Sequence, residues 1–96
     1  MIKRLGVLGG MGPAASAEFM VRLVAQTPAK RDQDHIPTIL WSDNTVPDRS
    51  TSMRNGDNKP LPYLLSGIQG LVSAGCNLIV IPCNTAHLWF NPKNLV

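Results

Sequence analysis

The sequence has 96 residues, of which 44% are hydrophobic and 16% are charged. A chain of this length and composition is too apolar to stay disordered, and it makes at most one domain. The Lys and Arg residues behind the net charge of +3 are scattered, so we expect no nucleic-acid partner. No apolar run reaches the roughly 20 residues of a membrane span, and no secretory signal precedes the first strand. We therefore expect a cytoplasmic protein that does not associate with membranes.

Apolar periodicity and turn residues predict strands and helices that alternate along the chain. A first strand over 2–8 leads into Gly9-Gly10-Met11-Gly12-Pro13, and a helix over about 13–27 follows, opened by Pro13. A second strand is expected at 37–42. Residues 43–60 are rich in Asn, Asp, Pro and Gly, and predict a long loop with a short turn of helix. Loops of this length inside a compact domain are usually functional.

The remaining sequence predicts a helix, a short strand and the beginning of another helix. Apolar residues from Leu61 to Val72 recur at helical spacing, and Gly75 suits the C-cap of that helix. The apolar run 78–81 predicts a strand that is buried on both faces. A turn over 82–87 follows, and the last helix is expected to run from about 84 to Asn91-Pro92.

This order of elements predicts an α/β fold with three layers: a parallel sheet of strand order 2-1-3, flanked by helices. Open sheets of this kind bind ligands at the carboxyl ends of their strands, where the chain reverses direction between neighbouring strands. The glycine turn and Cys83 both fall at that edge. We therefore expect residues 1–96 to form a single α/β domain with a small-molecule site there.

Cys83 is the strongest candidate for a reactive group. It follows a strand and precedes a predicted helix, whose unpaired N–H groups and dipole would lower the pKa of a thiol. Asn84 and Thr85 add hydrogen-bond donors in the same turn. His87 lies one helical turn further on, and either approaches the thiol or serves as a capping or core histidine. The alternative for Cys83 is a small buried hydrophobe.

Cys76 is expected to contribute only packing, because it lies between a helix cap and a strand. A disulfide between Cys76 and Cys83 would have to bridge the strand from one end to the other. Their spacing is also unlike that of a zinc site, which usually has close cysteine pairs. We therefore expect two free thiols and no metal.

Two further segments favour an anionic ligand. The glycine turn places backbone N–H groups at a helix N-terminus, which suits a carboxylate or a phosphate. The stretch from Gly10 to Ala15 also satisfies a dinucleotide fingerprint, with Asp43 closing the second strand, so a nucleotide-binding unit is a competing interpretation. Arg49, on the long loop, can clamp a carboxylate bidentately or remain a solvated arginine.

The three loop motifs together resemble the aspartate/glutamate racemase family. They are Gly9-Gly10-Met11-Gly12-Pro13, Val46-Pro47-Asp48-Arg49 and Pro82-Cys83-Asn84-Thr85-Ala86-His87, one after each strand. The resemblance covers essentially the whole chain, and the cysteine motif is its specific part. It implies a cofactor-independent amino-acid racemase with two similar α/β domains, and a cleft between them in which one cysteine from each domain faces the substrate.

The resemblance also assigns residues. Cys83 would be one of two acid/base thiols, and Arg49 would bind a carboxylate, that of the aspartate or glutamate side chain. His87 would modulate the site. The residues that would hold the substrate α-carboxylate are Gly10, Met11, Gly12, Asn84 and Thr85.

The sequence departs from the family in length. Family members are more than twice as long, and their second cysteine lies in a second domain, for which Cys76 cannot substitute. We therefore expect an incomplete half of a racemase-like fold that is inactive alone and needs a second domain or a homo-oligomeric partner. The competing interpretation is a non-catalytic remnant that binds a small carboxylic acid or packs on another chain.

Overall fold

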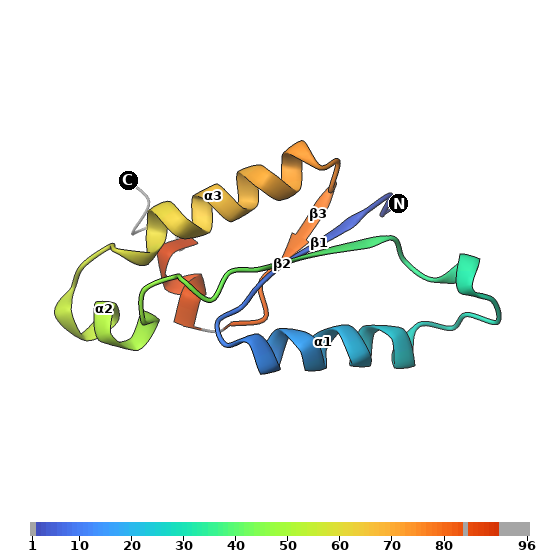
Figure 1. Ribbon diagram of the computed structural model, residues 1–96, viewed down its shortest axis with the longest axis horizontal. Coiled ribbons are helices and arrows are strands. Elements are labelled where there is room, and N and C mark those ends of the chain that lie inside the picture. The colour runs from blue at the N-terminus through green and yellow to red at the C-terminus, as the bar shows by residue number, and fades with distance from the viewer. Residues whose placement is uncertain (1, 84, 91–96) are drawn as a thin grey trace.

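The computed structural model describes residues 2–83 and 85–90. Its centre is a parallel sheet of three strands in the order β2-β1-β3 (Figure 1). The strands are β1 (Leu5–Gly9), β2 (Thr38–Ser42) and β3 (Leu78–Val80). In register, Leu5 of β1 lies opposite Thr38 on one side and Leu78 on the other. The predicted α/β class and strand order 2-1-3 are confirmed.

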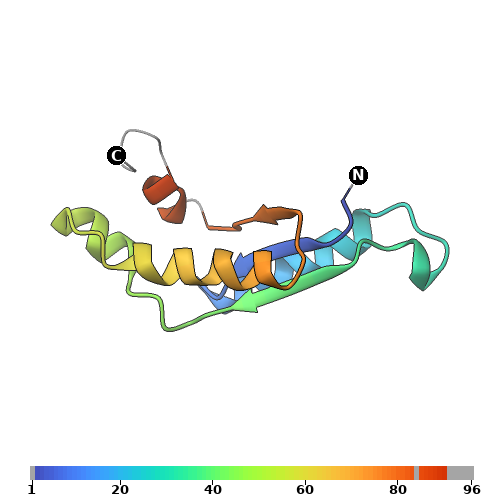
Figure 2. The ribbon, with the colours of Figure 1, turned by 90° about the horizontal axis from the view of Figure 1, so that it is seen from above.

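The two long helices cover opposite faces of the sheet (Figures 1 and 2). Right-handed crossovers require this, because the chain moves one way along the sheet from β1 to β2 and the other way from β2 to β3. The α-helices are α1 (Pro13–Gln26), α2 (Arg49–Asn55) and α3 (Pro60–Ser73). Two short 3₁₀ helices are η1 (Asp32–Asp34) and η2 (Thr85–Phe90). The helix expected from about 84 is thus a 3₁₀ helix from Thr85, and its predicted end at 91–92 lies outside the described residues.

The core forms where α3 crosses β1. The side chains of Leu8, Leu64 and Leu71 are almost completely buried there. A Cβ atom on Gly70 would lie 2.3 Å from the Trp41 ring, so the absence of a side chain lets α3 approach β2 closely. After Ala74, which caps α3, the N–H of Gly75 donates to Val72 O at 3.0 Å. Gly75 therefore stands one position beyond the cap and closes the helix as predicted.

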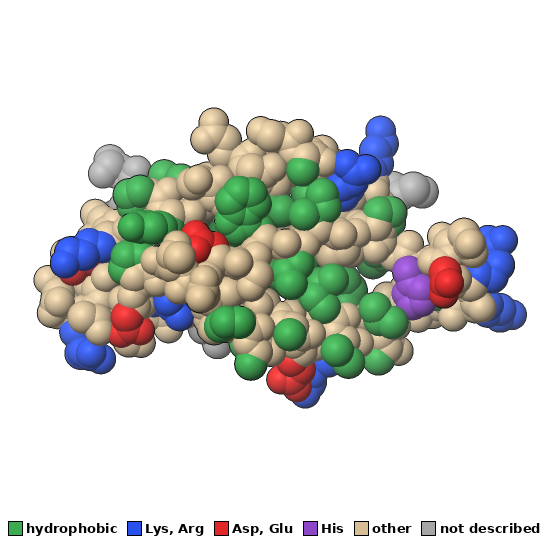
Figure 3. All heavy atoms as spheres, in the orientation of Figure 1, with side chains coloured by type: hydrophobic (Ala, Val, Ile, Leu, Met, Phe, Trp, Pro, Cys, Tyr) green, Lys and Arg blue, Asp and Glu red, His purple; other side chains and the backbone are tan. Residues whose placement is uncertain are grey.

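Apolar side chains also remain on the surface. The prediction that β3 is buried on both faces is wrong: Leu78 is 44% exposed, because β3 is an edge strand of this sheet. Val24 on α1 and Val72 on α3 are 55% and 57% exposed, and Figure 3 shows apolar side chains over both helices. The radius of gyration is 14.3 Å, against about 12.5 Å for a compact chain of this length. The elongated shape leaves this apolar surface uncovered.

Among the described residues, none of the helices combines the length and the hydropathy that crossing a bilayer would need.

Candidate functional site

The loops that follow the three strands meet at the carboxyl edge of the sheet, because the strands are parallel and in register. The buried apolar cluster that forms the core of the fold extends to these loops: Met11 follows β1, Val46 follows β2, and Ala86 and Trp89 follow β3. Cys83 is half-buried and packs against this cluster. The fold therefore brings together the three segments that the sequence singled out.

The backbone conformation of the turn after β1 is fixed by a close contact and by hydrogen bonds. Gly10 has a φ of +93°, and a Cβ atom there would lie 2.4 Å from the backbone nitrogen of Asp43. The buried Gly10 N–H donates to Ser16 Oγ at 3.1 Å, and that hydroxyl donates to Pro13 O at 3.0 Å. Only a glycine fits this conformation and this contact without strain.

The members of the glycine turn therefore differ in what they offer a ligand. The N–H of Gly10 is already bonded to Ser16, and the side chain of Met11 is buried in the cluster. Gly12 is exposed, caps α1, and has open space where a Cβ would stand. Ala15, the last position of the dinucleotide fingerprint, is exposed and does not form the close helix–strand contact that this position normally makes.

The loop after β2 is fixed at both of its ends. Asp43 Oδ1 accepts hydrogen bonds from the backbone N–H of Thr45 at 2.8 Å and from its hydroxyl at 2.5 Å. Asp48 caps α2 by accepting from the Thr51 N–H at 3.0 Å and from the Thr51 hydroxyl. These hydrogen bonds lower the pKa of Asp48, since they favour the charged carboxylate. The hydrogen bonds at the two ends of the loop therefore fix the position at which α2 begins.

Arg49 is the first residue of α2 and is half-buried. Its Nη1 donates to the carbonyls of Val46 at 3.3 Å and Pro47 at 3.5 Å, which are long hydrogen bonds. Its Nε is buried and has no hydrogen-bond partner among the described residues. The guanidinium is thus held in place by weak contacts and keeps unused donor capacity.

The turn after β3 carries the thiol. The Cys83 N–H donates to Ile81 O at 2.8 Å, and the His87 ring places Nε2 at 2.9 Å from the same oxygen. Thr85 is half-buried and begins η2. Asn84 lies outside the described residues. Cys76 is buried against Gly6 near the start of β1, at the end of β3 opposite to Cys83, and both thiols are free.

Sequence reasoning missed two groups at this edge. One is Ser16, which pairs with Gly9 where α1 crosses β1: a Cβ on Gly9 would lie 2.4 Å from that of Ser16. Small residues at both positions were the available signal for such a close approach. The other is the Ile81 carbonyl, which joins Cys83 and His87 and leaves no signal in a sequence.

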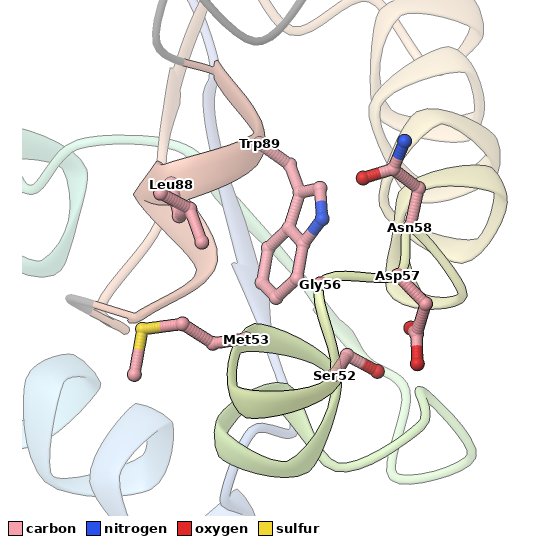
Figure 4. Close-up of a pocket in the computed structure, with 7 residues that line it drawn as sticks. All are labelled: Ser52, Met53, Gly56, Asp57, Asn58, Leu88 and Trp89. Atoms are coloured by element: carbon pink, nitrogen blue, oxygen red, sulfur yellow. The ribbon is translucent and has the colours of Figure 1, made fainter.

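A hollow of about 250 Å³ lies between α2, the connection 56–58 that leads to α3, and η2 (Figure 4). The indole of Trp89 projects into the space between these elements. The lining residues are Ser52, Met53, Gly56, Asp57, Asn58, Leu88 and Trp89. Neither Cys83 nor Arg49 lines it. Within residues 2–83 and 85–90, no three His, Cys, Asp or Glu side chains gather as a metal site.

Comparison with known proteins decides the family. The model of the Asp/Glu/Hydantoin racemase family matches residues 8–92, which include all three loops. The chain belongs to this family. The resemblance inferred from the loop motifs is therefore confirmed.

Two relatives show how much of a racemase this chain represents. The broad-specificity amino-acid racemase RacX of Bacillus subtilis (strain 168) is 26% identical over 90 residues, which are 90% of this chain and 39% of RacX. The structure of the Picrophilus torridus aspartate racemase superposes with a TM-score of 0.87 at 39% identity. That match covers 98% of this chain and 40% of the racemase. The racemase-family chain thus spans about two-fifths of each relative.

Proposed function

We propose that this chain supplies one side of an amino-acid racemase site, with Cys83 as the acid/base thiol. The observation that carries the proposal is the contrast between the two cysteines. Cys83 is half-buried among the carboxyl-edge loops, whereas Cys76 is 8% exposed and packs at the opposite end of β3. The chain matches the racemase family over residues 8–92, and this contrast supports Cys83 rather than Cys76 as the thiol that would meet a substrate.

The proposed step is a proton transfer. The Cys83 thiolate takes the α-proton of an amino acid, and the electron pair of the broken C–H bond passes into the α-carboxylate. Donors around that carboxylate stabilise the charge that develops on it. An acid on the far face must return a proton to complete inversion, and no residue of this chain is assigned to that role. Reprotonation by Cys83 itself restores the original enantiomer with a hydrogen from solvent.

The substrate we propose is an acidic amino acid, aspartate or glutamate. Arg49 would take a carboxylate, which is supported by the weak bonds of Nη1 and the unpartnered Nε. The α-carboxylate would lie between Gly12 at the head of α1 and the turn formed by Asn84 and Thr85. Gly10 would shape this pocket rather than donate to it, since its N–H is bonded to Ser16 Oγ. Met11, whose side chain is buried, would help to shape it. No cofactor is required.

A non-catalytic role is the second candidate. The chain spans about two-fifths of its relatives, and its other cysteine lies at the wrong end of β3. A protein with one thiol of the pair could retain acid binding without inversion. A second domain or a second copy of the chain would then be needed to complete the reaction.

Exchange of the α-proton separates the two candidates. Purified chain is incubated with L- or D-aspartate, or L- or D-glutamate, in heavy water, and the α-proton signal is followed by NMR. We expect loss of the signal with one enantiomer, retained in Cys76→Ala and abolished in Cys83→Ala. Full exchange by folded Cys83→Ala would remove the assignment. Binding of the acid without exchange by the wild-type chain would favour the non-catalytic role.

A further inference from the structure

His87 is placed to act on the thiol through the backbone. It lies on η2, whose other face is anchored: Ala86 is fully buried and Trp89 is 3% exposed. The His87 side chain itself is on the exposed side and reaches back to Ile81, where Nε2 lies 2.9 Å from the carbonyl oxygen. Because a carbonyl oxygen can only accept, Nε2 must carry the proton of this hydrogen bond.

The oxygen that His87 contacts is also the one that shapes the turn at the thiol. The Cys83 N–H donates to Ile81 O at 2.8 Å, which folds the chain back as it leaves β3. Two donors, one from the thiol residue and one from the anchored helix, therefore converge on a single carbonyl. Displacing the imidazole would release a hydrogen bond that ties η2 to this oxygen.

We propose that His87 is a positioning residue, which holds the Cys83 turn so that the thiol stays half-buried against the apolar cluster. The imidazole acts as a donor through Nε2–H, and its effect on the thiol passes through Ile81. The importance of this restraint for racemisation rests on the proposed function, but the restraint itself does not, and it can be measured without any turnover.

The measurement is the rate at which iodoacetamide alkylates Cys83, quantified by mass spectrometry of the modified peptide with the buried Cys76 as internal reference. His87→Ala and His87→Phe remove the donor, and the phenylalanine keeps the ring. His87→Gln restores a donor, since its amide nitrogen extends about as far as Nε2. Loss of one neutral hydrogen bond shifts a local opening equilibrium by up to about tenfold.

We therefore expect Cys83 alkylation to rise by about three- to tenfold in His87→Ala and His87→Phe, and to stay within about twofold of wild type in His87→Gln. Equal rates in all four proteins would overturn the proposal, as would a His87→Gln variant that behaves like His87→Ala. The ¹⁵N NMR spectrum of the wild-type His87 imidazole tests the same hydrogen bond without a substitution. A protonated Nε2 is expected, and an Nε2 that carries no proton would contradict the geometry.

These outcomes separate from those of the proposed function. If the wild-type chain exchanges no α-proton but the alkylation pattern is found, the restraint holds and the racemase role falls. If Cys83→Ala abolishes exchange but the His87 variants leave alkylation unchanged, the thiol chemistry holds and the positioning role falls.

Discussion

Replacing Gly10 with alanine should test whether the first loop depends on its contact with the second. The φ of +93° disfavours an L-residue by about 1–2 kcal/mol. The new Cβ would also lie 2.4 Å from the backbone nitrogen and 2.6 Å from the carbonyl carbon of Asp43, neither of which can move as a side chain could. Overpacking of this kind costs about 1–3 kcal/mol. The sum, about 2–5 kcal/mol, is a large share of the roughly 5–15 kcal/mol that stabilises a domain.

Gly56 provides the matched control. Its φ is +69°, but no atom lies within 4 Å of the position of a Cβ, so Gly56→Ala carries the conformational strain without the contact. Urea unfolding of both variants, followed by circular dichroism and by tryptophan fluorescence, gives the two free energies of unfolding. Gly10→Ala should be less stable than Gly56→Ala by about 1–3 kcal/mol. Equal stabilities would refute the close approach of the two loops.

Three further predictions concern the same edge of the sheet. Ser16→Ala should lower the free energy of unfolding, measured in urea, by about 1–3 kcal/mol, because the Gly10 N–H would be left buried and unpaired. The control Ser66→Ala, on the exposed face of α3, should change that free energy by less than about 0.5 kcal/mol. Asp48→Ala should loosen α2 at neutral pH. Because the folded-state pKa of Asp48 is lowered from 3.8, its contribution is present above that value and lost as the pH falls through the lower folded pKa, so circular dichroism of mutant and wild type should converge in acid. Arg49→Lys should weaken aspartate binding in an NMR titration by about tenfold, since a point charge replaces a planar fork, and unchanged affinity would exclude Arg49 from the site.

The elements that the sequence predicted well are those whose signals are local. Pro13 at the head of α1 and Gly75 beyond the end of α3 mark helix ends by their backbone preferences alone. The order 2-1-3 is one of the arrangements that right-handed crossovers allow, and it places helices on both faces of the sheet. Asp48 and Gly56 bound α2, and the loop prediction allowed for a short helix without placing it.

The features that could not be predicted depend on what lies across the fold. The apolar spacing of α1 includes Val24, but a sheet of three strands does not extend far enough to cover it. A short apolar run such as 78–81 has the same sequence pattern in an edge strand as in a central strand, so the sequence did not predict the exposure of Leu78. The last described helix is a 3₁₀ helix, whose tighter winding directs side chains differently from an α-helix, so the spacing of Cys83 and His87 does not reveal the contact of His87 with Ile81.

Protection of a single thiol offers the most direct test of where an amino acid binds. The purified chain is treated with iodoacetamide in the presence of rising aspartate or glutamate, and the modification of each cysteine is measured separately. If an amino acid binds against Cys83, the alkylation rate of Cys83 should fall to a limiting value as the amino acid saturates, while the rate of Cys76 stays unchanged. Alkylation of Cys83 at one constant rate up to saturating concentrations of both acids would contradict the placement of the substrate at this edge of the sheet.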